Sequence, residues 1–283
     1  MSLFLAMLAQ VGPFANPPAA PPLRPPQNGR HGERQSPPAA APAAPAPRNR
    51  LEFCLAGAAN APIDAIDDAE TWRDAVQGSA KAEPNLCLGS AHARLEQWDL
   101  AEAAFLAGRD AAADNDRAMR AKLGAMAGNA ALAQGAFERA LPPLDMAHAD
   151  ANATGDLRLT GEVQIDRARA LVGLKREAEA NLALVEARTS AADNPLAWLL
   201  SATLSRRQGK LAAAQAQIST AASLSPRDPE VGLEAGVMAM LAGNEAAARK
   251  SWQSAIETAP ASEAAATAKA YLAQLAEAPQ SKP

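Results

Sequence analysis

The strongest constraint on the fold is a run of residues that recurs at an interval of 34 positions between residues 194 and 260. Its members are mostly small, turn-forming or helix-ending residues. The first copy contains Trp198, Ala202, Gly209, Ala214, Ala221, Leu224 and Pro226, and the second contains Gly232, Gly236, Gly243, Ala248, Ala255, Thr258 and Pro260. A fixed interval of this length is typical of helical hairpins that stack side by side.

The recurring residue types suit two antiparallel helices packed at close range. Ala202 and Gly236 are small enough to let a second helix approach. Gly209 and Gly243 stand where the first helix of each pair would end, and a positive φ is favourable there. Proline at position 226 would stop the second helix before the next unit begins. The stretch therefore predicts two helices in each unit.

This pattern resembles the tetratricopeptide repeat family, which is marked by an aromatic at the fourth place, small residues at the eighth and twentieth, and Gly, Ala and Pro further along. The unit 195–228 has all of these marks, whereas the unit 229–262 has Gly232 instead of the aromatic and its large residue at Trp252. The resemblance implies an all-α fold, a right-handed solenoid of about five to six stacked hairpins. It also implies a binding scaffold.

Weaker copies of the unit extend the pattern toward the N-terminus. We expect further repeats at 82–115, 121–154 and 161–194, an irregular first hairpin at 50–81, a capping helix at 263–277 and a disordered tail at 278–283. Two positions depart from the pattern. Pro142 and Pro143 fall inside an expected second helix, where each costs about 3 kcal/mol or more, so we expect a kink or a restart at Pro142. Lys175 replaces the turn glycine of its unit.

The first 49 residues differ in composition from the rest. Residues 3–15 form an apolar run that is too short to span a bilayer and resembles the core of a secretion signal. No Lys or Arg precedes the run and no clean cleavage site follows it, so a retained apolar helix that anchors the chain or docks on the body is the alternative. Residues 16–49 are rich in Pro and Ala and predict a disordered, extended linker. These features favour a periplasmic protein, or one held at the membrane and facing the periplasm, over a cytoplasmic one.

Charge is unevenly distributed along the chain. The net charge is −4, yet residues 1–50 carry +4, from Glu33 and five arginines at positions 24, 30, 34, 48 and 50. Subtracting that +4 from the total leaves −8 on the remainder. A mildly acidic body argues against a phosphate-binding surface, so we expect no nucleic-acid partner.

Nothing in the sequence has the spacing that catalysis or metal binding requires. The histidines, at positions 31, 92 and 148, lie in separate segments. No phosphate-binding loop, nucleophile elbow or metal-ligand motif is present. We therefore expect no enzyme activity, no catalytic residues, no metal and no cofactor, and we keep a hydrolase of cell-wall polymer only as a minor alternative.

Cys54 and Cys87 are the only cysteines and lie 33 residues apart, almost one repeat. This spacing would put them at similar heights on neighbouring first helices. A disulfide there would join the irregular first hairpin to the next unit and stabilise it by about 3–4 kcal/mol in an oxidising compartment. Two buried, reduced thiols are the alternative.

The family resemblance places a concave groove on the first helices of the hairpins. Its exposed positions would be Arg94, Asn129, Arg169, Leu199, Thr203, Arg206, Arg207, Leu233, Val237 and Met240. Such a surface is basic and then apolar, and it favours an acidic peptide. Some family members hold a terminal carboxylate with Lys and Asn, but only Lys122 and Asn129 match here, while Asp166 and Leu196 do not. The four tryptophans, at positions 72, 98, 198 and 252, are expected in the core.

These features together predict a non-enzymatic scaffold in the cell envelope that binds a peptide or a partner protein. The alternative is a structural component that assembles with itself as a homo-oligomer, or supports a complex, through its convex face. Membrane attachment through the N-terminus is compatible with either role.

Overall fold

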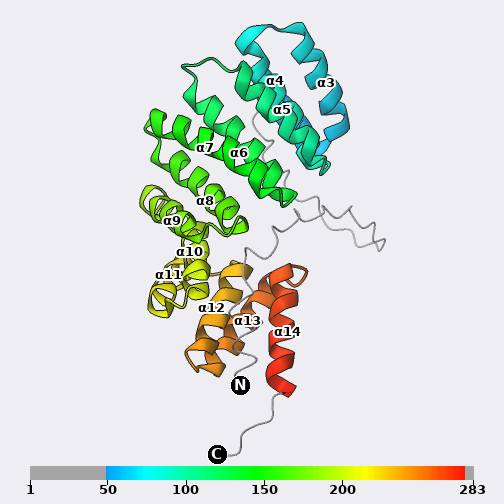
Figure 1. Ribbon diagram of the computed structural model, residues 1–283. Helices are drawn as coiled ribbons and strands as arrows, with labels where there is room; N and C mark the ends of the chain where they lie inside the picture. Colours follow the sequence, from blue (N-terminus) through cyan, green and yellow to red (C-terminus); the bar gives the residue numbers. More distant parts are fainter. Residues whose placement is uncertain (1–48, 278–283) are drawn as a thin grey trace, which may run out of the picture.

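The computed structural model describes residues 49–277, and within this range it contains thirteen α-helices and one short 3-10 turn, with no strand (Figure 1). The first hairpin is α2 (Arg50–Asn60) with α3 (Pro62–Ala75), and the 3-10 turn Gly78–Lys81 follows. The other hairpins are α4 (Ala82–Arg94) with α5 (Trp98–Ala111), α6 (Arg117–Ala133) with α7 (Phe137–Thr154), α8 (Leu157–Gly173) with α9 (Glu177–Ser190), α10 (Pro195–Arg207) with α11 (Leu211–Leu224), and α12 (Pro229–Leu241) with α13 (Glu245–Thr258). A last helix, α14 (Glu263–Glu277), follows them. The apolar run 3–15, nearly all of the linker 16–49 and the tail 278–283 lie outside the described residues.

Successive hairpins stack in an arc, which confirms the expected all-α solenoid (Figure 1). Each first helix contacts the first helix of the next hairpin, as the pairs α4 with α6, α6 with α8, α8 with α10, and α10 with α12 show. Extensive contacts between successive second helices are absent from the described part of the chain. The first helices therefore line the inner side of the arc and the second helices the outer side.

Within a hairpin, a small residue on the first helix faces a large one on the second. An added Cβ would overlap the Phe105 ring at Gly89, the Leu144 side chain at Gly128, and the Trp252 ring at Gly236. Each pair is separated by 16 residues, so the eighth position of a unit meets the twenty-fourth. The unit 229–262 can place its large residue at Trp252 because Gly236 leaves room for it.

Two first helices begin four residues before the predicted starts of their units, at 117 and 157 rather than 121 and 161. An aspartate caps each of them. The Asp116 carboxylate accepts a hydrogen bond from the Met119 N–H, and the Asp156 carboxylate accepts one from the Leu159 N–H, both at 3.1 Å. These caps satisfy free N–H groups and fix the start of each helix. The extra residues 155–160 therefore mostly extend α8.

The predicted restart at Pro142 does not occur, because α7 is continuous from Phe137 to Thr154. The two prolines leave the carbonyls of Glu138 and Arg139 without their usual helical donors. Both residues are exposed, so water can satisfy those carbonyls. The remaining turns of this long helix pack against α6 and α8 and hold it together.

The tryptophans divide into two groups. Trp72 and Trp252 are buried, as predicted, whereas Trp98 and Trp198 are only half-buried. The Trp198 indole donates a hydrogen bond to the Ala192 carbonyl at 2.8 Å, and the Arg188 guanidinium lies 5.5 Å from its ring centre. Trp198 therefore packs at the edge of the stack, not at its centre.

Helix α14 covers the last hairpin. It contacts α12 and α13 and buries Ala264, Ala265, Ala268 and Tyr271. The Tyr271 and Trp252 rings lie 5.2 Å apart. The apolar side of the final hairpin is thus shielded from water, as a terminal cap must do.

No helix within residues 49–277 combines the length and the apolar character that crossing a membrane requires.

Candidate protein-binding groove

The ten residues predicted to line the groove differ widely in exposure. Arg94 and Arg207 are exposed, and Asn129, Arg169, Leu233 and Met240 are half-buried. The exposure predicted for the other four is wrong: these are Leu199, Thr203, Arg206 and Val237, each 3% exposed or less. The surface left open is therefore narrower than the repeat pattern predicts.

Arg206 is buried because it forms an ion pair with the next hairpin. Its guanidinium donates to both carboxylate oxygens of Glu234 on α12, at 2.6 and 3.2 Å. Burial raises the pKa of Glu234, although the Arg206 charge acts in the opposite direction. The pair joins α10 to α12, so Arg206 stabilises the stack and does not attract an acidic ligand.

A second polar contact joins α6 to α8 on the inner side. The Asn129 amide donates to one oxygen of Asp166 at 2.7 Å, and Arg169 donates to the other at 3.3 Å. Burial raises the pKa of Asp166, because loss of water outweighs both partners. The Asn129 donor is thus used within the protein, which argues further against a carboxylate-binding role for it.

These contacts share one position of the repeat. Glu234 and Asp166 each occupy the sixth place of their unit and reach back to the preceding first helix. Cys87 also holds the sixth place, and it forms a disulfide with Cys54 on α2, with 5.9 Å between the Cα atoms. The sixth position therefore faces the previous first helix. An acidic residue at the sixth position therefore indicates a polar contact with the previous first helix. The predicted groove positions alone do not contain this signal.

Half-buried side chains of the inner face also lie on α12, toward the C-terminal end of the stack. Glu230, in the first turn of α12, is half-buried, and no ion pair joins it to another described residue. Burial and then the charge of Asp228 raise its pKa, and the charge of Glu263 on α14 adds to this, while Arg169 opposes it. Half-buried Leu233 and Met240 lie on the same helix. This part of the groove is acidic and apolar, whereas the sequence predicts a groove that is basic at its start and only apolar at this end.

Other buried charges connect helices and offer no binding surface. Asp150 on α7 is 2% exposed and accepts from Arg109 at 2.8 Å and from Arg117 at 2.7 Å. Arg120 lies 3.7 Å away. One carboxylate therefore holds α5, α6 and α7 together.

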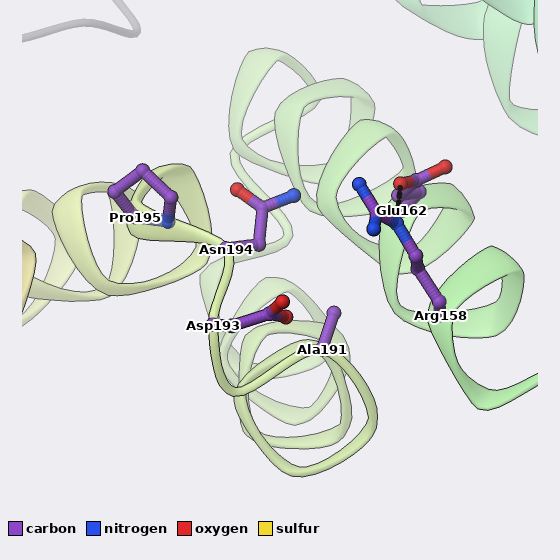
Figure 2. Close-up of a pocket in the computed structure, with 6 residues that line it drawn as sticks. All are labelled: Arg158, Glu162, Ala191, Asp193, Asn194 and Pro195. Carbon is purple, nitrogen blue, oxygen red and sulfur yellow. Dashed lines mark hydrogen bonds and ion pairs between the residues drawn. The ribbon is translucent and has the colours of Figure 1, made fainter. Parts of the chain in front are cut away.

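A cleft of about 220 Å³ lies between α8 and the loop that precedes α10 (Figure 2). Arg158 and Glu162 of α8 line one side and form an ion pair at 3.0 Å, while Asp193 and Asn194 lie on the loop opposite them. The Asn194 side-chain oxygen Oδ1 caps α10 by accepting a hydrogen bond from the Leu196 N–H. Arg158 and Glu162 therefore satisfy each other, and the Asn194 side chain serves as a helix cap.

Among residues 49–277, no group of three His, Cys, Asp or Glu side chains is placed to hold a metal ion. His148 lies 2.9 Å from a Glu186 oxygen and 2.9 Å from the Gln164 amide nitrogen, which joins α7, α8 and α9. Like the Asp150 cluster, these contacts connect neighbouring helices.

No protein-family model matches the sequence, and no curated protein matches it significantly. Solved structures do resemble it. BtubC (BKLC) from P. vanneervenii is 13% identical with a TM-score of 0.56, covering 81% of this chain and 93% of that one. The 41-to-end part of MamA from Desulfovibrio magneticus RS-1 is 13% identical with a TM-score of 0.50, and the match covers 64% of this chain and 97% of the MamA chain. YrrB, described as a TPR protein with an unusual peptide-binding site, is 20% identical with a TM-score of 0.45, and the match covers 75% of this chain and 99% of the YrrB chain. At these identities, likeness shows the fold alone.

Proposed function

We propose that this tetratricopeptide-type solenoid is a non-enzymatic scaffold that binds a peptide or a partner protein on its inner face. An arc of first helices offers a continuous concave surface, and each hairpin adds one helix to it. The surface carries exposed Arg94 and Arg207, half-buried Arg169 and Glu230, and apolar Leu233 and Met240. Such a mixture suits an extended segment with both charged and apolar side chains.

The observation that carries the proposal is the environment of Glu230. A half-buried carboxylate without an ion pair is costly, and its raised pKa reflects that cost. A partner that brings a Lys or Arg to this position would relieve the cost. We therefore propose a ligand with a basic residue at the α12 end of the groove, instead of the acidic ligand that the sequence favours.

Site-specific photo-cross-linking in the native cells tests the proposal. A photoreactive residue is placed at Arg207 or Met240, on the inner first helices, and at Leu182 on α9, which is 68% exposed. We expect the two inner probes to capture the same protein and the Leu182 probe not to capture it. Capture of that protein from Leu182 alone would contradict binding on the inner face.

We also propose an envelope location, in the periplasm or at the membrane facing it. The disulfide between Cys54 and Cys87 supports this, since disulfides persist in oxidising compartments. Osmotic-shock fractionation followed by thiol labelling provides the test. Recovery in the periplasmic or membrane fraction with both thiols blocked is expected, whereas a cytoplasmic protein with two free thiols would contradict it.

Self-assembly through the outer face is a second candidate. Leu182 and Val185 lie one turn apart on α9 and are 68% and 44% exposed, so they form a small apolar patch on the outer side. Light scattering at several concentrations separates the two roles. A stable oligomer that Leu182→Glu dissociates would favour assembly, and a monomer at all concentrations would exclude it.

A further inference from the structure

We propose that the surface around Arg188 and Trp198, where the outer helix α9 packs against α10, binds an acidic segment of a partner protein through an ion pair between Arg188 and an Asp or Glu of that segment. This surface is separate from the inner face, so the inference goes beyond the proposed function. It commits to one occupant, a protein segment in which a carboxylate is flanked by apolar side chains.

Arg188 lacks a counter-ion although it is half-buried. Other outer arginines are paired, as Arg249 is with Glu245 at 2.7 Å, but no residue of the described part of the chain forms an ion pair with Arg188. The nearest acid in the sequence, Glu186, contacts His148 instead. The next outer helix, α11, contains no charged residue. Burial lowers the pKa of Arg188 and no carboxylate opposes this effect, so an incoming carboxylate would be favourable.

The guanidinium of Arg188 is held in place before any partner arrives. Its Nη1 donates a hydrogen bond to the Ser201 hydroxyl, and its centre lies 5.5 Å from the centre of the Trp198 ring. Both supports are themselves fixed, because the Trp198 indole donates to the Ala192 carbonyl at 2.8 Å and the Ser201 hydroxyl donates to the Ala197 carbonyl at 2.7 Å. A side chain that is already ordered loses less entropy when it binds a ligand.

Two nitrogens of Arg188 remain available to a ligand. Within the described part of the chain, Nε and Nη2 donate to no acceptor. Neither is among the buried side-chain atoms that lack a partner, so solvent reaches both. Nε and Nη2 lie on one edge of the planar guanidinium and match the two oxygens of a carboxylate. The contact that this arginine can add is therefore a bidentate pair with Asp or Glu.

Apolar side chains adjoin this arginine. Val185 lies one turn before Arg188 on α9 and is 44% exposed, and Leu182, a further turn away, is 68% exposed. The half-buried Trp198 ring packs against the core cluster that α10 shares with α11. Arg and Trp beside apolar surface are typical of the centre of a protein interface. A segment with apolar residues next to its acidic residue would fit this surface.

The charge of the chain restricts the kind of anion. The net charge is −4 and residues 1–50 carry +4, so the remainder carries −8. A body of this charge repels nucleic acids and anionic lipid surfaces, which present many negative charges at once. A protein segment with one acidic residue among apolar ones largely avoids that repulsion, so it is the ligand that we propose.

A random peptide library displayed on phage tests the proposal. The library is depleted on the full-length Arg188→Gln variant and then selected on the wild type. We expect the selected peptides to share an Asp or Glu beside apolar residues, and a synthetic peptide of this kind to bind the variant about tenfold more weakly in fluorescence anisotropy. Selected peptides without a shared acidic residue, or no peptide that depends on Arg188, would overturn the proposal.

The matched control is Arg249→Gln. Arg249 is also half-buried on an outer helix, α13, but it already has its ion-pair partner Glu245. This variant should bind the peptide as the wild type does. An equal loss of affinity in both variants would contradict a specific role for Arg188.

A double-mutant cycle shows whether the two charges meet, even if Arg188→Gln is less stable than the wild type. The acidic residue of the peptide is changed to the corresponding amide, and the four affinities are compared. If the carboxylate pairs with Arg188, the two changes together weaken binding about as much as either change alone. Losses that simply add would contradict the pair.

Two further measurements separate this surface from the other candidates. Leu233→Ser with Met240→Ser alters the inner face and should leave the affinity for the peptide within about twofold of the wild type. A loss as large as that of Arg188→Gln would place the peptide on the inner face and overturn the proposal. Light scattering tests a second copy of the chain as the occupant, because a wild-type oligomer that Arg188→Gln dissociates would show that a foreign segment is the wrong assignment.

Discussion

The first and second helices of one hairpin differ sharply in burial. Helix α10 buries nine of its 13 residues, whereas α11 buries only Ala214, Ile218 and Ala221 out of 14. α10 contacts α8, α9, α11 and α12, while α11 contacts chiefly α10 and α12. A first helix in this stack is therefore a core element, and only the edges of its inner side remain for a ligand.

Two adjacent arginines at the end of α10 give the largest expected contrast. Arg206→Ala leaves Glu234 buried without its ion-pair partner and should lower the free energy of unfolding by about 3–5 kcal/mol. Arg207 is exposed, and Arg207→Ala should change the free energy of unfolding by less than about 0.5 kcal/mol. Urea denaturation of both variants measures the difference. Equal effects would mean that Arg206 lies in the open groove, as the repeat pattern predicts.

Two tryptophans invert the comparison, because the more buried one lies on a second helix. Trp252 on α13 is fully buried against Gly236, so Trp252→Ala should cost about 3–5 kcal/mol. Trp198 on α10 is half-buried, and Trp198→Ala should cost about 1–2 kcal/mol. Thermal melts followed by circular dichroism can rank them. A larger loss at Trp198 would contradict the packing described for both hairpins.

The turns between first and second helices provide a smaller contrast. Lys175 adopts a φ of 59° and Gly209 a φ of 73° at equivalent turns. Lys175→Gly should therefore stabilise the protein by about 0.5–1 kcal/mol, and Gly209→Ala should destabilise it by a similar amount. Differential scanning calorimetry would detect both shifts. Destabilisation by Lys175→Gly would show that contacts of the lysine side chain stabilise the fold by more than the strain of its positive φ destabilises it.

The smallest expected effect depends on pH. Because the pKa of Glu230 is raised, the folded protein holds this proton more tightly than the unfolded chain does. The contribution of the protonated Glu230 carboxyl to stability is fully present at a pH below the pKa of an ordinary carboxyl. It is lost as the pH rises through the pKa of Glu230 in the folded protein. Glu230→Gln should therefore stabilise the protein at pH 7 by about 0.3–0.5 kcal/mol, after allowance for solvent screening. The gain should vanish near about pH 4, whereas a gain that grows on acidification would contradict the raised pKa.

Much of the fold could be predicted from the sequence, because its determinants are local. Gly209, Gly243 and the prolines at 226 and 260 mark helix ends by their backbone preferences alone. The start of α8 lies four residues before its repeat unit, because the cap at Asp156 lies outside the repeat pattern. Of the two outcomes expected at Pro142, a kink or a restart, the restart does not occur, because packing against α6 and α8 outweighs the two prolines.

The candidate groove was predicted less well, because exposure there depends on other hairpins. Thr203 and Arg206 look open when α10 is considered alone, but α12 brings Glu234 against them. The acidic character at Glu230 was missed in part for the same reason, since Glu263 approaches it only when α14 packs against α12, although Asp228 is its neighbour in the sequence. The acid at the sixth position of its unit, Glu234, would have indicated the burial of Arg206.

The most direct measurement of the central claim is the affinity of the full chain for the protein captured by the inner probes. An inner set, Leu233→Ser with Met240→Ser, is compared with an outer set, Leu182→Ser with Leu211→Ser. If the inner face is the binding surface, the inner set loses at least tenfold in affinity while the outer set stays within twofold of the wild type. Equal affinities for the inner set and the wild type, or a loss confined to the outer set, would contradict the claim.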